Sequence, residues 1–160
     1  MLDPIVKTIE VPCSQAEAFD VFVGEMGSWW PLGKFTVSAM GGRPAKTIRV
    51  EAKQGGTIVE IGPDDNEHLW GSIRAYEPHE FVSMDFHFAP PGVEVTDRTL
   101  VEVRFTALSD ARTRVELTQS NWEALGEQAA MIRSGYVHGW TIIFEQAYRT
   151  ALGTRAQGAQ

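Results

Sequence analysis

The sequence predicts one α+β domain in which a curved antiparallel sheet packs against a single long C-terminal helix. Three observations carry this prediction. A strand and two short helical segments come before residue 31, apolar and polar residues alternate over much of residues 46–119, and an apolar stripe with helical spacing follows. Because one helix must cover the apolar face of the sheet, we expect a cavity between the two layers.

The N-terminal segment predicts a strand followed by two short helices. Apolar residues alternate over about residues 4–11, which is typical of a strand. Ser14 is a good N-cap, and Glu17 three residues later completes a capping box for the first helix. A second short helical turn should carry Trp29 and Trp30.

Two irregular segments interrupt the regular pattern. Residues 31–45 contain two prolines and three glycines, and they predict a loop that is long for a compact domain. Loops of this length more often serve function than merely connect elements. Pro90, Pro91 and Gly92 open the second irregular segment.

Six further strands are predicted from alternation at a period of two, which favours antiparallel strands with one covered and one wet face. They lie at about residues 47–51, 58–61, 69–76, 82–88, 101–106 and 114–119. The alternation puts Leu69 and Ile73 on the face opposite Trp70.

The final helix is predicted over about residues 127–152. At about 100° per residue, its apolar residues form one broad stripe that includes Trp140 and Phe144. Gly139 lies at the edge of this stripe, where a missing side chain would allow close approach to the sheet. We expect one domain over residues 1–153 and a frayed polar tail over residues 154–160.

Composition limits the function classes. The chain has 160 residues, 43% of them hydrophobic and 22% charged, which is typical of a soluble globular domain. Its net charge of −7 and its scattered basic residues argue against a nucleic-acid or anionic-membrane partner. No apolar run approaches the ~20 residues of a membrane span and no signal peptide is visible, so a cytoplasmic location is expected.

Neither a metal site nor a cofactor is predicted. The four histidines show no HxH, HExxH or HxxxH spacing, and the single cysteine, Cys13, is isolated at the end of the first strand. Cys13 is interpreted as a small half-buried residue rather than a reactive thiol. No phosphate-binding loop or dinucleotide motif occurs.

The order of several short motifs resembles one known group, the START-like helix-grip superfamily (SRPBCC, birch-pollen-allergen-like). Within it, the chain is similar to the homologues of the activator of the heat-shock protein 90 ATPase. The motifs are Val11-Pro12, Ala18-Phe19, Trp29-Trp30-Pro31, Gly55-Gly56, IRAYEP at 73–78, TRVELTQS at 113–120, Trp122 and His138-Gly139-Trp140. The resemblance implies a β-α-α-β6-α fold with an internal cavity. Gln119 stands where a histidine is common, and Phe86-His87-Phe88 stands where tryptophan is frequent.

Two histidines leave alternatives open. Alternation puts His87 on the same face as Ser83 and Asp85, and that face should be the wet one. A shift of one residue would turn all three into the cavity as acid–base candidates. His138 lies opposite the apolar stripe and is expected to be exposed, unless a tilt of the helix at Gly139 lets it cap one end of the cavity.

The residues expected to line the cavity are aromatic, aliphatic and a few polar side chains. They are Trp29, Met84, Phe86, Val103, Phe105, Leu117, Gln119, Arg133, Tyr136 and Trp140. Arg133 would suit a ligand carboxylate or enolate, and its alternative is a surface ion pair. Five tryptophans are more than a small core needs, so some of them should serve the cavity, whereas Trp30 and Trp140 are expected in the core.

Three function classes follow. The first is a non-catalytic domain that binds a small apolar or aromatic molecule, because the fold forms a cavity and no nucleophile motif such as Gly-x-Ser-x-Gly occurs. The second is an enzyme of the cyclase, dehydratase or hydrolase type acting in the same cavity. The third, implied by the resemblance, is a chaperone-regulating interaction module. A homodimer through an exposed sheet edge is a further possibility.

Overall fold

The computed structural model describes residues 2–158, and its helices and strands follow the order expected from the sequence with one addition, the short helix α3. The first half contains β1 (Ile5–Val11), α1 (Gln15–Gly24), α2 (Met26–Trp29), α3 (Val37–Met40), β2 (Thr47–Val50) and β3 (Thr57–Ile61). The second half contains β4 (Glu67–Glu77), β5 (Phe81–Phe86), β6 (Thr99–Ser109), β7 (Arg112–Ser120), a 3-10 turn (Trp122–Gln128) and the helical segments α4 (Ala129–Ile142), Ile143–Tyr148 and α5 (Arg149–Gly158).

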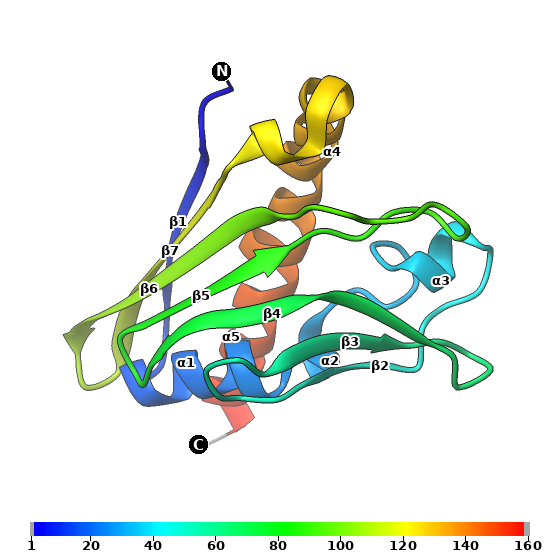
Figure 1. The fold of residues 1–160 in the computed structure, drawn as a ribbon. Coiled ribbons are helices and arrows are strands. Elements are labelled where there is room, and N and C mark those ends of the chain that lie inside the picture. The colour runs from blue at the N-terminus through cyan, green and yellow to red at the C-terminus, as the bar shows by residue number, and fades with distance from the viewer. Residues whose placement is uncertain (1, 159–160) are drawn as a thin grey trace.

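The seven strands form one antiparallel sheet in the order β1-β7-β6-β5-β4-β3-β2. The sheet curls around the C-terminal helix, and α1 and α2 close one end (Figure 1). This arrangement confirms the predicted α+β helix-grip fold. The helix begins at Ala129 and continues through a π-helical stretch to Gly158, past the predicted domain end at residue 153. Residues 159–160 of the predicted tail lie outside the described residues.

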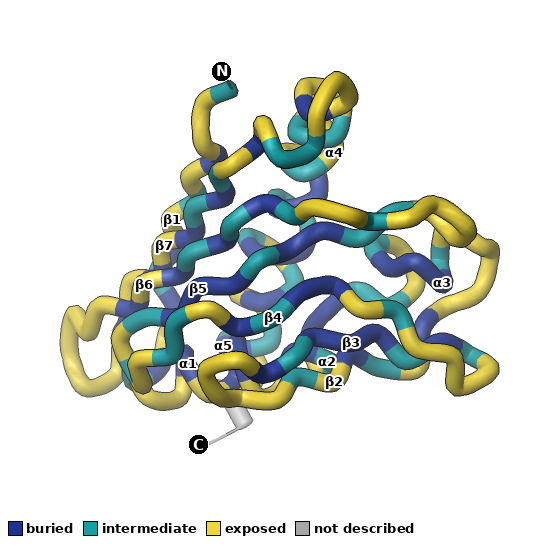
Figure 2. Tube along the Cα trace, viewed as in Figure 1, coloured by how far each residue is buried: buried dark blue, intermediate teal, exposed yellow. Residues whose placement is uncertain are grey.

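The space between the middle of the sheet and the helix is filled by aromatic side chains. The ring of Phe22 on α1 lies 5.2 Å from that of Tyr148, and the ring of Phe86 on β5 lies 5.9 Å from that of Trp140. All five tryptophans are at most 5% exposed, and of the five only Trp30, which was expected in the core, also lines the cavity described below. Figure 2 shows the result: buried residues run along the middle strands, and exposed residues gather in the connecting loops.

A bulge in β4 changes which face Trp70 occupies. Ile58 pairs with Gly71 and Val59 pairs with Leu69, so Trp70 is the extra residue on its strand. The bulge turns Trp70 into the core, where it is 0% exposed, and leaves Leu69 48% exposed. The predicted alternation was therefore wrong at this point. Gly71 is required beside the bulge, because a Cβ there would lie 1.8 Å from the carbonyl oxygen of Asp85.

The predicted loop over residues 31–45 contains the short helix α3, which a buried carboxylate holds in place. Thr36 caps α3 by accepting a hydrogen bond from the Ala39 amide. Glu60 on β3 is 0% exposed and accepts hydrogen bonds from the amides of Val37 and Ser38, each at 2.7 Å. The Ser38 hydroxyl and the indole N–H of Trp70 also donate to Glu60, so its two oxygens satisfy four donors.

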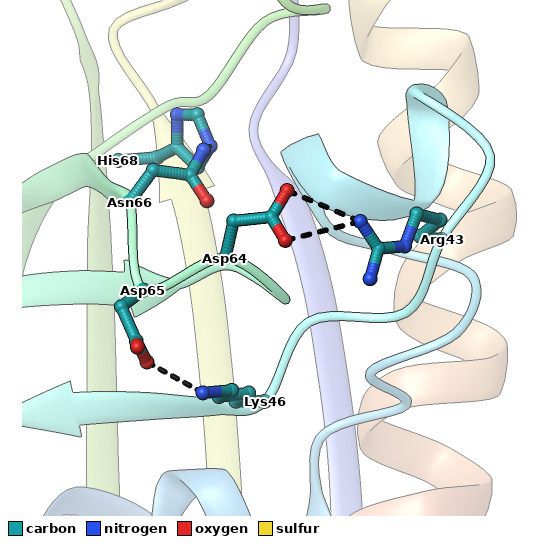
Figure 3. A network of polar contacts seen from close by, with 6 residues as sticks. All are labelled: Arg43, Lys46, Asp64, Asp65, Asn66 and His68. Carbon is teal, nitrogen blue, oxygen red and sulfur yellow. Dashed lines mark hydrogen bonds and ion pairs between the residues drawn. The ribbon is translucent and has the colours of Figure 1, made fainter.

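Ion pairs fasten the segment after α3 to the turn between β3 and β4 (Figure 3). Arg43 donates to both oxygens of Asp64 at 3.1 and 3.2 Å, and Lys46 donates to Asp65 at 2.6 Å. These side chains are more than half exposed, so the pairs add little to stability. The buried Glu60 is thus the main anchor of α3.

Candidate functional site

A cavity of about 660 Å³ opens at one end of the molecule, beyond the part of the core that the aromatic side chains fill. Three segments that are far apart in the sequence form its walls. They are the segment around α3, the loop that joins β5 to β6, and one face of the C-terminal helix as far as Ile143 with the turn before it. The volume falls in the range of small-molecule sites, which is roughly 300–1,000 Å³.

The cavity wall is mostly apolar. Trp30, Phe35, Phe88, Ile132 and Ile143 are among the side chains that line it. Phe88, two residues after the end of β5, stacks on the buried Trp70 with ring centroids 4.4 Å apart. The indole of this tryptophan also donates a hydrogen bond to Glu60. Such a surface favours a ligand with a large apolar body.

Exposed apolar residues frame the opening. Met40 on α3, Val93 in the β5–β6 loop and Met131 on α4 are 47%, 57% and 67% exposed, and all three line the cavity. Each comes from a different wall. Exposed apolar side chains at the mouth of an apolar cavity offer a hydrophobic molecule a surface to contact as it enters.

One pair of polar side chains lies together in this wall. The Nδ1 atom of His87 is 3.0 Å from the hydroxyl of Tyr136, and both residues line the cavity. His87 follows the last residue of β5, and Tyr136 lies on α4. Burial raises the pKa of the Tyr136 hydroxyl, so this group stays a phenol. Burial lowers the pKa of His87, and the positive charge of Arg98 lowers it further.

The lowered pKa of His87 makes stability depend on pH. Above about pH 6.5 the imidazole is neutral in both the folded and the unfolded chain. Below about pH 6.5 the unfolded chain binds a proton at this position before the folded chain does, so acid favours unfolding until the folded pKa is reached. We expect the melting temperature of the wild type to fall more steeply from about pH 7 to about pH 5 than that of His87→Gln. Parallel curves from the two proteins would contradict this assignment.

Of the ten residues predicted to line the cavity, the structure places only Tyr136 in its wall. Eight others lie in the buried core under the middle of the sheet, namely Trp29, Met84, Phe86, Val103, Phe105, Leu117, Gln119 and Trp140. The indole of Trp29 donates to the carbonyl of Val21 at 2.9 Å. The resemblance implied an elongated cavity under the C-terminal helix, whereas aromatic side chains fill much of that space and the cavity described here lies at one end.

Gln119 and Arg133 have other partners. The Gln119 side chain accepts from the indole of Trp140 at 2.7 Å and donates to the Thr99 hydroxyl at 2.9 Å, so it is bonded at both ends within the core. Arg133 donates from Nε to the carbonyl of Asp3 at 2.7 Å. In the described part of the chain it makes neither of the predicted contacts, because it does not line the cavity and forms no ion pair.

The predicted common facing of Ser83, Asp85 and His87 does not hold. Asp85 accepts from the Ser72 amide at 2.7 Å and lies away from the cavity. His87 reaches the cavity because β5 ends at Phe86, after which strict alternation no longer applies. The sequence did carry a sign that the strand ends here, because Pro90 and Pro91 follow shortly after His87 and cannot continue a regular strand. His138 is exposed, as expected.

Cys13 is buried, and burial raises the pKa of its thiol to about 11, which agrees with a structural residue. Within residues 2–158, no group of three or more His, Cys, Asp or Glu side chains is placed to hold a metal ion. No helix in the same range is both long and apolar enough to cross a membrane.

An antiparallel sheet curled around a long C-terminal helix, with a cavity at one end, defines the helix-grip class of proteins. Comparison with known families refines this assignment. The chain belongs to the family described as Activator of Hsp90 ATPase homolog 1-like protein, whose model matches residues 15–150. The resemblance inferred from the sequence motifs is confirmed.

Solved structures similar to this chain have several different names. CalC from Micromonospora echinospora, a self-sacrificing resistance protein, is 22% identical over 95% of both chains with a TM-score of 0.69. The anthrahydroquino-gamma-pyrone synthase Txn09 is 22% identical over 93% of this chain and 96% of its own, with a TM-score of 0.64. An Hsp90 activator from Plasmodium falciparum, PFC0360w, is 17% identical over 94% and 96%, with a TM-score of 0.60. No curated protein sequence matches the chain. At these identities the likeness shows the fold alone.

Proposed function

We propose that this protein binds a small, largely apolar molecule in the cavity between α3, the β5–β6 loop and α4. The observation that carries the proposal is the cavity itself, with its volume of about 660 Å³ and its aromatic and aliphatic wall. The exposed apolar residues at its mouth support entry from one side.

The test uses a fluorescent probe and a variant that fills the cavity. N-phenyl-1-naphthylamine is uncharged and apolar, and its fluorescence rises in an apolar site. Gly135 on α4 lines the cavity, and a Cβ placed there has no heavy atom within 4 Å. We expect saturable binding to the wild type and binding at least about tenfold weaker to Gly135→Leu.

Gly153→Leu is the matched control. Gly153 belongs to the same long helix, its Cβ would also meet nothing within 4 Å, and it does not line the cavity. Both substitutions remove a helical glycine and are expected to raise the melting temperature slightly. Equal loss of binding in both variants, or no saturable binding to the wild type, would count against the proposed function.

A second candidate function is catalysis in the same cavity. The His87–Tyr136 pair favours it, because a neutral imidazole bonded to a phenol can accept and return a proton. The name of the synthase Txn09 is a further reason to test it. A molecule that co-purifies with the protein and changes mass on incubation with wild type, but not with Tyr136→Phe, would indicate an enzyme. The chaperone-regulator hypothesis rests on the family name and stays a prediction.

A further inference from the structure

The hydrogen atom between His87 and Tyr136 can be placed from the surrounding contacts. In the described part of the chain, His87 Nδ1 is the side-chain partner of the Tyr136 hydroxyl. Nδ1 can either accept from the hydroxyl or, in the other tautomer, donate to it. If Nδ1 donated, the hydroxyl hydrogen of this partly buried tyrosine would have no acceptor among the described residues and would face a mostly apolar cavity, which is costly. The hydroxyl of Tyr136 therefore donates to Nδ1.

This direction decides what His87 offers to the cavity. A neutral imidazole carries one hydrogen, so accepting at Nδ1 leaves that hydrogen on Nε2. The only fully enclosed side-chain N or O atom without a partner in residues 2–158 is Nε1 of Trp122. The Nε2 atom of His87, which has no partner among these residues, is therefore in contact with open space. The open space that His87 lines is the cavity.

The charges at the mouth disfavour an anionic ligand. Lys34 is the one basic side chain that lines the cavity in the described part of the chain, and the acidic Glu94 and Asp97 line it as well. His87 brings no positive charge, because it donates as a neutral imidazole. A neutral N–H donor in an apolar wall matches an uncharged acceptor, and a carbonyl oxygen is the common one.

Resting on the proposed function, we propose that the ligand is an uncharged, largely apolar ring compound with a carbonyl oxygen that accepts a hydrogen bond from Nε2–H of His87. For this hydrogen bond Tyr136 is a positioning residue, since it holds the imidazole in the tautomer that donates from Nε2. Ring compounds suit a wall that presents Trp30, Phe35 and Phe88.

Two probes with one ring skeleton test this proposal. 9-Fluorenone and fluorene differ in a single carbonyl oxygen, and each is used to displace N-phenyl-1-naphthylamine at about pH 7.5. Water also binds the carbonyl, so the informative quantity is the ratio of the two affinities in each protein. We expect the ratio of fluorenone to fluorene affinity to be about three- to tenfold higher in the wild type than in His87→Phe.

The variants separate failure of this inference from failure of the proposed function. Gly135→Leu should weaken both probes alike. Equal ratios in wild type and His87→Phe, with both probes bound, would overturn the carbonyl proposal and leave the proposed function standing. If the fluorescent probe does not bind the wild type and neither ring compound binds in a direct titration, both the carbonyl proposal and the proposed function would be overturned. If His87→Phe does not fold, His87→Leu, which also has no side-chain donor, takes its place.

The role of Tyr136 has its own readout. Long-range ¹H–¹⁵N correlation spectra of protein labelled at histidine distinguish the two imidazole tautomers. We expect His87 in the wild type as the Nε2–H tautomer and a mixture of tautomers in Tyr136→Phe, with an intermediate affinity ratio. The Nδ1–H tautomer in the wild type would contradict the assignment on which the proposal depends.

Discussion

Replacing Glu60 with alanine is expected to destabilise the protein by about 3–5 kcal/mol, because each buried donor left without an acceptor costs roughly 1–3 kcal/mol. Three such donors would remain: the amides of Val37 and Ser38 and the indole N–H of Trp70. For a chain of this size the melting temperature should fall by about 10 °C or more. Urea and thermal unfolding measure both quantities.

The same substitution should also weaken probe binding. α3 and the segment before it supply Met40, Phe35 and Lys34 to the cavity, and Glu60 holds the start of this helix. Without the carboxylate, the surface ion pairs of Arg43 and Lys46 are too exposed to keep α3 in place. The wall on this side should therefore loosen before the rest of the sheet unfolds.

Two variants make the Glu60 result specific. Glu67→Ala, on the neighbouring strand β4, removes an exposed carboxylate paired with Arg49 at 3.3 Å and should change stability by less than about 0.5 kcal/mol. Glu60→Gln keeps the shape but replaces one acceptor oxygen with a donor, and an intermediate loss is expected. A cost below about 1 kcal/mol for Glu60→Ala would mean that the carboxylate does not hold α3.

The strands and the long helix could be predicted because each has one face covered by the core, and this repeats apolar residues at a regular spacing. Each strand of the sheet has a covered face, so alternation marks residues such as Val101, Val103 and Phe105, all at most 1% exposed. The turns between strands also carry recognisable residues, as at Gly55-Gly56. The fold therefore followed from local patterns together with the family motifs.

The candidate site could not be predicted in the same way, because it depends on departures from these patterns. The bulge at Trp70, the helix inside residues 31–45 and the end of β5 before His87 all break the local period. Glu60 gave no signal, since a glutamate in a strand is usually placed on the wet face. Only Tyr136, on the regular surface of α4, was found by its helical position.

The buried hydrogen bonds that link Trp140, Gln119 and Thr99 should contribute more to stability than any other polar contact except those of Glu60. The indole of Trp140 donates to Gln119, Gln119 donates to Thr99, and the Thr99 hydroxyl donates to the carbonyl of Phe86. Gln119→Leu keeps nearly the same shape but leaves the indole N–H without an acceptor in a site that is 0% exposed at Gln119. We expect a loss of about 2–4 kcal/mol, measured by urea unfolding.

A double-mutant cycle separates the hydrogen bond from packing. Trp140→Phe removes the N–H along with part of the ring, and it should cost roughly 1–3 kcal/mol by itself because a small void remains. In that background no indole N–H is left to be orphaned, so Gln119→Leu should cost at least about 1 kcal/mol less than in the wild type. Equal costs in both backgrounds would mean that Gln119 contributes to stability through its volume rather than through its hydrogen bonds.

A clearly smaller cost in the Trp140→Phe background would mean that the hydrogen bond between the two side chains contributes to stability. The position then requires a particular polar side chain, since only a group that can both accept from Trp140 and donate to Thr99 satisfies the two neighbours.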